Sequence, residues 1–141
     1  MDDLNILLVD DEAEFLEILV KRLTKRKVNA MGVSSGEAAL RTLRETAVDV
    51  VVLDVRMPEM DGIETLREIK KYHPLVEVIM LTGHANLEVA IEGMEAGAFD
   101  YLLKPMDIDE LLYKVEDAHK KKALQEQKIK RIQNSTAARL G

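Results

Sequence analysis

The sequence predicts an α/β protein built on a doubly wound, parallel sheet. Five short runs rich in Val, Ile and Leu alternate with segments whose apolar residues recur at helical spacing. The run Val50–Leu53 has no polar residue and is too short for a helix, which is typical of a strand buried on both faces. Because strands and helices alternate at short spacing, right-handed crossovers should place every strand's carboxyl end at one edge of the sheet.

The expected elements follow one another closely along the chain. The first helix begins with acidic residues and ends with basic ones, as the helix dipole favours. Ser34 and Glu37 have the spacing of a capping box at the start of the second helix, Gly97 suits the end of the fourth, and Asp107 is expected to cap the last. Strands are expected over residues 4–9, 28–32, 50–54, 76–81 and 99–103, and helices over 12–27, from 34 past 43, 62–72, 86–96, and from 107 to about 133.

Composition limits the classes of protein that fit. At 141 residues, the chain is expected to form one domain with an appendage. The absence of Cys excludes a disulfide framework and thiolate metal sites. The sequence has no apolar run of transmembrane length, and Met1-Asp2-Asp3 is acidic where a signal peptide would be basic. We therefore expect a cytoplasmic protein that does not engage a membrane.

Charge is distributed unevenly along the chain. From residue 119 onward there are seven Lys and Arg against one Glu, so this segment carries +6 and the first 118 residues carry −12 of the net −6. An acidic body argues against direct nucleic-acid binding. The basic tail has two interpretations, a contact for an acidic partner or a solvated helix face.

Polar residues stand at the predicted carboxyl ends of four strands. Asp10 and Asp11 follow the first strand, Asp54 ends the central one, and Thr82 and Lys104 follow the fourth and fifth. Taken singly, each has a simple structural explanation, such as a helix cap or a salt bridge at a strand end. Their convergence at one edge of an open α/β sheet, where such folds place their ligands, favours a functional site.

This set of side chains suits phosphoryl chemistry around a metal ion. Two unit charges about 4 Å apart repel by about 4 kcal/mol at an effective dielectric of about 20, so clustered carboxylates favour a bound cation. An all-oxygen donor set without His or Cys suits Mg²⁺. Lys104 and Thr82 would supply a charge and a hydrogen bond to phosphoryl oxygens. With His73 and His84 outside the set, Asp54 is the expected nucleophile.

These residues resemble the receiver domain of two-component response regulators over about residues 4–118. The resemblance rests on Asp10-Asp11, on the segment from Leu53 to Gly62, on Thr82-Gly83 and on Tyr101-Leu-Leu-Lys104-Pro105, all in the expected order. Short motifs such as Leu81-Thr-Gly-His-Ala are similar to those in receivers of the nitrogen-regulation class of activators.

The resemblance implies a flavodoxin-like fold with strand order 2-1-3-4-5 and Mg²⁺-dependent transfer of a phosphoryl group from a histidine kinase to Asp54. It assigns Asp11, Asp54 and the backbone carbonyl of Arg56 as metal ligands, with Asp10 acting largely through water, and Lys104 and Thr82 as catalytic partners. It implies a switch in which Thr82 moves to the phosphate and Tyr101 turns inward, altering the face formed by residues 86–118. Such a domain catalyses only its own phosphorylation and dephosphorylation and is not otherwise an enzyme.

The carboxyl-terminal segment departs from a plain receiver. We expect a receiver domain over residues 1–118 and a helical extension over 119–141. A weak heptad seam runs through the last helix. It supports a homodimer, formed through this helix and the face of the fourth helix, fifth strand and fifth helix, or a linker to an output domain, as much as a frayed amphipathic tail. Its members are Ile108, Leu111, Val115, Ala118, Lys122, Gln125, Ile129 and Ile132. No phosphate-binding Gly-Lys loop or helix-turn-helix pattern is present, so the chain is a stand-alone receiver or a piece of a longer regulator, with an unknown downstream effector.

Three other functions deserve comparison. A stand-alone intermediate in a phosphorelay would use the same site. A phosphatase of the dehalogenase-like class would need an acidic residue two positions after Asp54, where Arg56 stands. A flavin-binding electron carrier would need a Gly- and hydroxyl-rich loop after the first strand, where Asp10 and Asp11 would repel phosphate.

Overall fold

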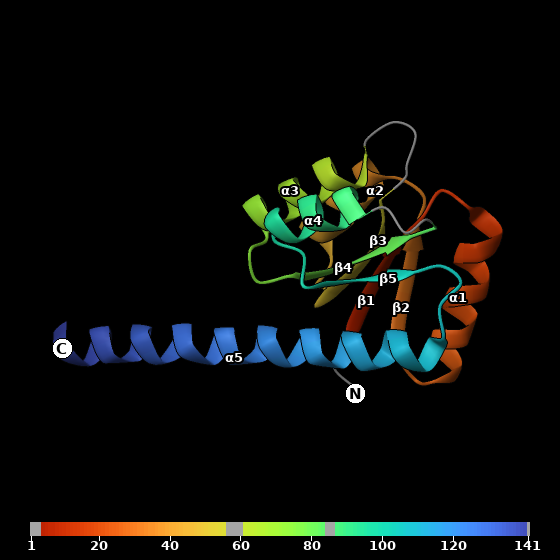
Figure 1. The fold of residues 1–141 in the computed structure, drawn as a ribbon. Coiled ribbons are helices and arrows are strands. Elements are labelled where there is room, and N and C mark those ends of the chain that lie inside the picture. The colour runs from red at the N-terminus through yellow and green to blue at the C-terminus, as the bar shows by residue number, and fades with distance from the viewer. Residues whose placement is uncertain (1–3, 56–60, 84–86, 141) are drawn as a thin grey trace.

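A computed structural model of the chain describes residues 4–55, 61–83 and 87–140. Five parallel strands form one sheet in the order β2-β1-β3-β4-β5, which confirms the predicted fold and strand order (Figure 1). In chain order the elements are β1 (Asn5–Val9), α1 (Ala13–Lys25), β2 (Asn29–Val33), α2 (Gly36–Glu45), β3 (Val50–Asp54), α3 (Gly62–Tyr72), β4 (Glu77–Thr82), α4 (Leu87–Glu95), β5 (Asp100–Leu103) and α5 (Ile108–Leu140).

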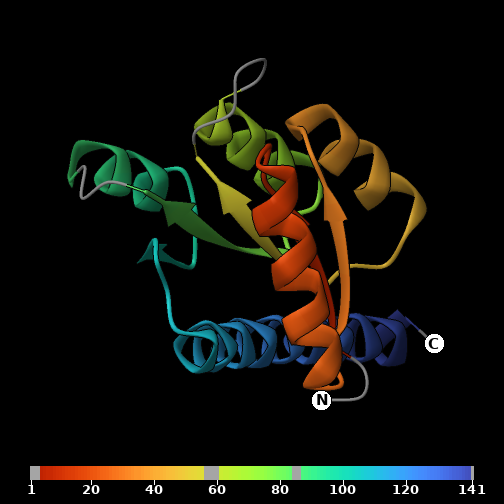
Figure 2. The ribbon, with the colours of Figure 1, turned by 90° about the vertical axis from the view of Figure 1, so that its right-hand side faces the viewer.

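The sheet separates two apolar layers. Alternate strand residues such as Leu7, Val51 and Met80 face α2, α3 and α4, while their neighbours such as Leu8 and Val52 face α1 and α5. Figure 2 shows the same division of the helices about the sheet. Since both faces are covered, the central strands are apolar between their ends, and all five residues of β3 are buried.

The structure corrects one predicted helix end and confirms another. The cap of α2 is Ser35 and not Ser34, because the Ser35 hydroxyl accepts the Ala38 backbone N–H at 3.1 Å. The predicted capping box is therefore wrong by one residue. At the end of α4 the prediction is confirmed: Gly97 has φ +108°, and the Ala98 N–H returns to the Gly93 carbonyl at 3.0 Å.

The last helix is longer than predicted. Asp107 precedes it as expected, its carboxylate accepting the Asp109 N–H at 2.9 Å, but the helix continues to Leu140 instead of ending near Gln133. No Gly or Pro interrupts residues 108–140, and the Thr136 hydroxyl donates to the Ile132 carbonyl at 3.0 Å. The helix passes beneath the strands and projects well past the body (Figure 1). Among the described residues, no helix combines the length and apolarity that a bilayer span requires.

Two ion pairs fasten α5 to the amino-terminal edge of the sheet. Lys121 lies 3.2 Å from the buried carboxylate of Glu77, which opens β4. Lys122 lies 3.0 Å from Asp49, just before β3, and 3.1 Å from Glu126. Burial lowers the pKa of Lys122, but the hydrogen bonds and charges of Asp49 and Glu126 outweigh burial and raise the pKa above the ordinary lysine value.

This raised pKa predicts a loss of stability in alkali. A group whose pKa rises on folding stabilises the fold fully below its unfolded-state pKa, about 10.4 for Lys, and loses that contribution as the pH rises through the folded-state pKa. We expect the free energy of unfolding to fall above about pH 10, and to fall less steeply in Lys122→Met because one such group has been removed. Urea unfolding from pH 8 to pH 12 measures both slopes. Lys128→Met, on an exposed position of the same helix, should keep the wild-type slope; equal slopes in all three proteins would contradict the prediction.

Candidate functional site

The strand ends bring together the side chains that the sequence singled out. Asp10 directly follows β1, Asp54 ends β3, Thr82 ends β4, and Lys104 directly follows β5. Backbone hydrogen bonds fix this edge: the Lys104 N–H donates to the Thr82 carbonyl at 2.8 Å, and the Val55 N–H donates to the Leu81 carbonyl at 3.1 Å. The predicted convergence at one edge of the sheet is therefore present.

The chain beside Asp54 is packed against the start of α3. The Gly62 N–H donates to the Val55 carbonyl at 3.2 Å. A Cβ atom on Gly62 would lie 2.3 Å from the Val55 Cα and 2.8 Å from the Asp54 carbonyl oxygen, so only glycine permits this approach. Asp61 caps α3, its carboxylate accepting the backbone N–H groups of Ile63 and Glu64. This local structure fixes the position of the end of β3, and therefore of Asp54, relative to α3.

Lys104 is the positive centre of the site. Its Nζ atom donates to Asp10 Oδ2 at 2.7 Å, and lies 3.5 Å from Glu12 Oε1 and 3.9 Å from Asp54 Oδ2. The side chains of Asp10 and Asp54 are 3% and 5% exposed, so these charges meet where solvent screens them little. The second oxygen of Asp10 accepts the Glu12 N–H at 2.9 Å, which sets the orientation of that carboxylate.

The surroundings keep Lys104 protonated. Burial of the ammonium lowers the pKa of Lys104, but the hydrogen bond to Asp10 and the negative charges of Asp54, Asp10 and Glu12 outweigh burial and raise the pKa above the ordinary lysine value. The side chain therefore carries its full positive charge across the neutral pH range.

Three carboxylates form a potential cation site. Among the described residues, oxygen atoms of Asp10, Glu12 and Asp54 all lie within 4.8 Å of one another. Sequence reasoning missed Glu12, whose only signal was its place directly after the two aspartates. Asp11, predicted as a direct ligand, is exposed beside this trio and is not one of its members. Arg56, whose carbonyl was predicted as a further ligand, lies outside the described residues, as does His84.

The two residues of the predicted switch stand in different surroundings. Thr82 is buried at the end of β4, whereas Tyr101 on β5 is 39% exposed. The strands that carry them are paired, with Met80 opposite Tyr101 and Thr82 opposite Leu103. The aromatic ring thus lies outward in this structure, on a strand next to the one that carries the hydroxyl.

Comparison with known proteins identifies the class that this fold and acidic edge define. Residues 6–116 match the family model described as the response regulator receiver domain. The chain belongs to this family.

Individual relatives indicate which group of receiver domains this chain resembles in sequence. The chain is 43% identical over 117 residues to the transcriptional regulatory protein ZraR of Escherichia coli K12, covering 83% of this chain and 26% of ZraR. It is 40% identical over 111 residues to the DNA-binding transcriptional regulator NtrC of Klebsiella pneumoniae, covering 79% of this chain and 24% of NtrC. The chain thus spans about a quarter of the length of these curated relatives, which are activators of the class that the sequence motifs suggested.

Solved structures agree with this assignment. A response regulator receiver domain protein from Clostridium thermocellum superposes with a TM-score of 0.82 at 38% identity, over 86% of this chain and 98% of that one. NtrX from Brucella abortus also gives a TM-score of 0.82, at 31% identity, over 87% of this chain and 28% of that one.

Removing the positive centre should destabilise the fold. In Lys104→Met the buried Asp10 and Asp54 carboxylates lose that ammonium, and we expect the free energy of unfolding to drop by about 3 kcal/mol in chelator. Urea unfolding measures the loss. The control is Lys114→Met, whose ammonium pairs with the more exposed Asp100 and whose loss should cost under about 1 kcal/mol. Equal stability of the two variants would show that Lys104 does not compensate these acids.

Proposed function

We propose that this chain is a phosphorylation-activated switch that accepts a phosphoryl group on Asp54 from a histidine kinase in a Mg²⁺-dependent reaction. The observation that carries the proposal is the position of Asp54. Its carboxylate ends a fully buried strand, belongs to a trio of acids and lies 3.9 Å from the Lys104 ammonium. Membership of the receiver family supports a histidine kinase as the donor.

The donor set fits Mg²⁺. Three carboxylates within 4.8 Å offer only hard oxygen ligands, and an ion held by one or two of them retains positions for water and a phosphoryl oxygen. In this proposal Asp11, Asp54 and the Arg56 carbonyl hold the ion directly, and Asp10 acts largely through water. Glu12 adds a fourth acid, which the structure brings close to Asp10 and Asp54. Bound Mg²⁺ would offset negative charge between the acids and the incoming phosphoryl group.

In this proposal each residue of the site has its own role in phosphoryl transfer. An Asp54 oxygen attacks phosphorus, the bond from phosphorus to the kinase's imidazole nitrogen breaks, and that nitrogen keeps the electron pair. Lys104 provides a permanent positive charge toward the phosphoryl oxygens, and the Thr82 hydroxyl provides a hydrogen bond. Water then attacks the phosphorus of the acyl phosphate, and the bond from phosphorus to the Asp54 oxygen breaks. This step releases inorganic phosphate and returns the free carboxylate, so the domain turns over only its own modification.

A surface next to the site is suited to carry the output. The face made of α4, β5 and α5 exposes Leu87, Ile91, Met94, Tyr101 and Leu103, each at least 39% accessible. In the proposed switch, Thr82 moves toward the phosphoryl group and Tyr101 turns inward, which changes the shape of this face. Both rotamers suit a side chain with an apolar ring and a polar tip. A population shift between two such states would signal phosphorylation to a partner.

Replacing the phosphoacceptor tests the proposal. Asp54→Asn should abolish labelling by acetyl phosphate with Mg²⁺, because an amide cannot form the acyl phosphate; intact-protein mass spectrometry measures the adduct. Asp100→Asn changes a carboxylate away from the acidic trio and should label like the wild type. Unchanged labelling of Asp54→Asn, or its absence from the wild type under all Mg²⁺ concentrations, would overturn the assignment.

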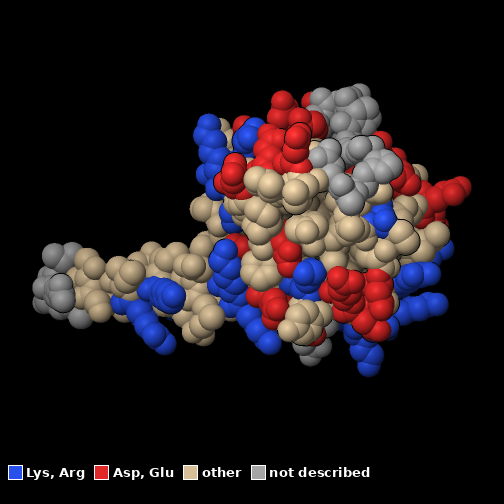
Figure 3. Space-filling view, viewed as in Figure 1, with Lys and Arg blue, Asp and Glu red and all other residues tan. Residues whose placement is uncertain are grey.

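We also propose that residues 119–141 act as a helical extension that pairs two copies of the chain. The fold buries the first part of the heptad seam. Leu111, Val115 and Ala118 are fully buried against the sheet, so these residues are not available to contact a second copy of the chain. Past Lys122 the same seam continues with Ile129 and Ile132, which are 40% and 66% exposed. The visible face of the projecting helix carries Lys and Arg, whereas Asp and Glu gather on the body (Figure 3).

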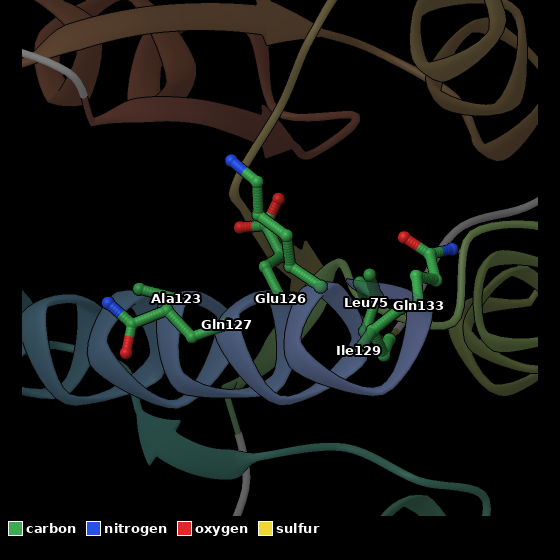
Figure 4. A pocket seen from close by; sticks show the side chains of 7 residues that line it. Leu75, Ala123, Glu126, Gln127, Ile129 and Gln133 are labelled. Carbon is green, nitrogen blue, oxygen red and sulfur yellow. The ribbon is translucent and has the colours of Figure 1, made fainter. Parts of the chain in front are cut away.

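The part of the extension nearest the body also borders a hollow. A hollow of about 550 Å³ lies between Leu75, ahead of β4, and the projecting helix (Figure 4). Its lining from the helix is Ala123, Glu126, Gln127, Ile129, Lys130 and Gln133. The free part of the seam spans only about two heptads, so we expect pairing that depends on concentration, in the micromolar range or weaker.

Charged substitutions on the free seam test this pairing. The double variant Ile129→Asp with Ile132→Asp should be monomeric by multi-angle light scattering at concentrations where the wild type forms dimers, because both carboxylates would be buried at the seam. Ser135→Asp, an exposed position off the seam, should keep the wild-type mass. A monomeric wild type at all concentrations, with and without a phosphate mimic, would defeat the proposal.

A further inference from the structure

An aromatic ring outside the predicted site faces its central cation. Phe15 belongs to the first turn of α1, and the Lys104 Nζ atom lies 4.4 Å from the centre of its ring. A cation within about 6 Å of a ring centre is attracted by the ring's quadrupole. Phe15 is an apolar residue of α1, and its side chain is half-buried against the core layer shared by α1 and α5.

Lys104 thus has two kinds of partner. Carboxylates of Asp10, Glu12 and Asp54 lie 2.7, 3.5 and 3.9 Å from its Nζ atom, and the Phe15 ring provides a neutral aromatic contact. The Lys104 side chain is only 14% exposed, so water competes little with either contact. A cation–π contact gains strength when the cation is desolvated in this way.

The two kinds of partner respond differently when the site is used. In the proposed function, Asp10 and Asp54 also serve a metal ion and the phosphoryl group, so their attraction for Lys104 weakens when they do so. The ring has no charge to share and no lone pair for a metal, and its attraction for the ammonium persists. It is therefore the contact that holds Lys104 over the acids while the carboxylates change partners.

We propose that Phe15 is a positioning residue that holds the Lys104 ammonium over the acidic trio through a cation–π contact. The part of this proposal that concerns phosphorylation rests on the function proposed above. A plain packing role is the alternative, and it predicts that any apolar side chain of similar size would serve. The aromatic face separates the two roles, so one decisive variant replaces the ring with an apolar side chain and the other keeps the ring.

Two variants and two measurements form the test. Phe15→Leu keeps an apolar side chain and a good helix former but removes the ring, while Phe15→Tyr keeps the ring. An apolar hollow of about 210 Å³ that Phe15 and Pro105 help to line gives room for the added hydroxyl. Ile18→Ala, an exposed position one turn further along α1, is the control for altered packing of the helix.

The first measurement needs no metal and no phosphate donor. In NMR spectra of the full chain in chelator, the ε-methylene protons of Lys104 should be shifted upfield by the ring current in the wild type, in Phe15→Tyr and in Ile18→Ala. The shift should vanish in Phe15→Leu. Identical Lys104 shifts in the wild type and Phe15→Leu would show that the ring does not lie over this side chain, and would overturn the proposal.

The second measurement is the initial rate of labelling by acetyl phosphate, a donor that does not require docking of a kinase. Phe15→Leu should be slower by roughly three- to tenfold, as expected for loss of one desolvated cation–π contact, with Phe15→Tyr and Ile18→Ala near the wild-type rate. A wild-type rate in Phe15→Leu, or an equal loss in Phe15→Tyr, would overturn the positioning role. Absence of labelling in the wild type would instead refute the proposed function, and the NMR comparison would still decide the contact.

Discussion

Charge compensation at one edge of the sheet is the constraint on which the site depends. Two nearly buried carboxylates, Asp10 and Asp54, meet there because the strands that carry them are neighbours in a parallel sheet. Like charges at such a distance resist burial unless a cation accompanies them. Lys104 brings that cation from β5, at the far end of the strand order, and its position explains why the fold tolerates the cluster. The same arrangement leaves the site responsive to any ligand that changes the local charge.

The opposite edge of the sheet carries a second set of charges. The strand that ends in Asp54 follows Asp49, which pairs with Lys122, and the strand that ends in Thr82 opens with Glu77, which pairs with Lys121. Each of these strands therefore has a site residue at one end and an ion pair to α5 at the other. Lys70 of α3 also lies 3.2 Å from Glu77 and donates to the carbonyls of Pro74 and Val76, which fixes the start of β4. The direction in which the extension leaves the body is consequently set by the central strands.

The family relationship and the geometry support different parts of the functional picture. The receiver assignment rests on a match over residues 6–116 and on the superposed structures. The acidic trio and the Lys104 contacts show which atoms of this chain meet at the carboxyl edge of the sheet, where we propose that phosphorylation takes place. The extension lies beyond residue 116, outside the family match, and the exposed part of its seam supports the pairing that we propose for it.

Much of the fold was readable from the sequence because its signals are local. The alternation of short apolar runs with helical patterns determined the parallel sheet, and the rule that parallel strands end at one edge brought Asp10, Asp54, Thr82 and Lys104 together. Element ends were less certain: Ser34 and Ser35 are both good caps, and only the backbone conformation at Ser35 selects between them.

Contacts between distant side chains were decided only by the tertiary structure. No sequence pattern indicates that Glu12 lies beside Asp10 and Asp54. Nor does any pattern indicate that the Phe15 ring lies over Lys104, which is 89 residues further along the chain. Lys122 shows the reason most clearly. In sequence it is a polar defect in an apolar seam, whereas in the fold it lies against Asp49 and is nearly buried. Local spacing determines which face of a helix a residue occupies, but the charge that meets it there depends on how distant strands pack.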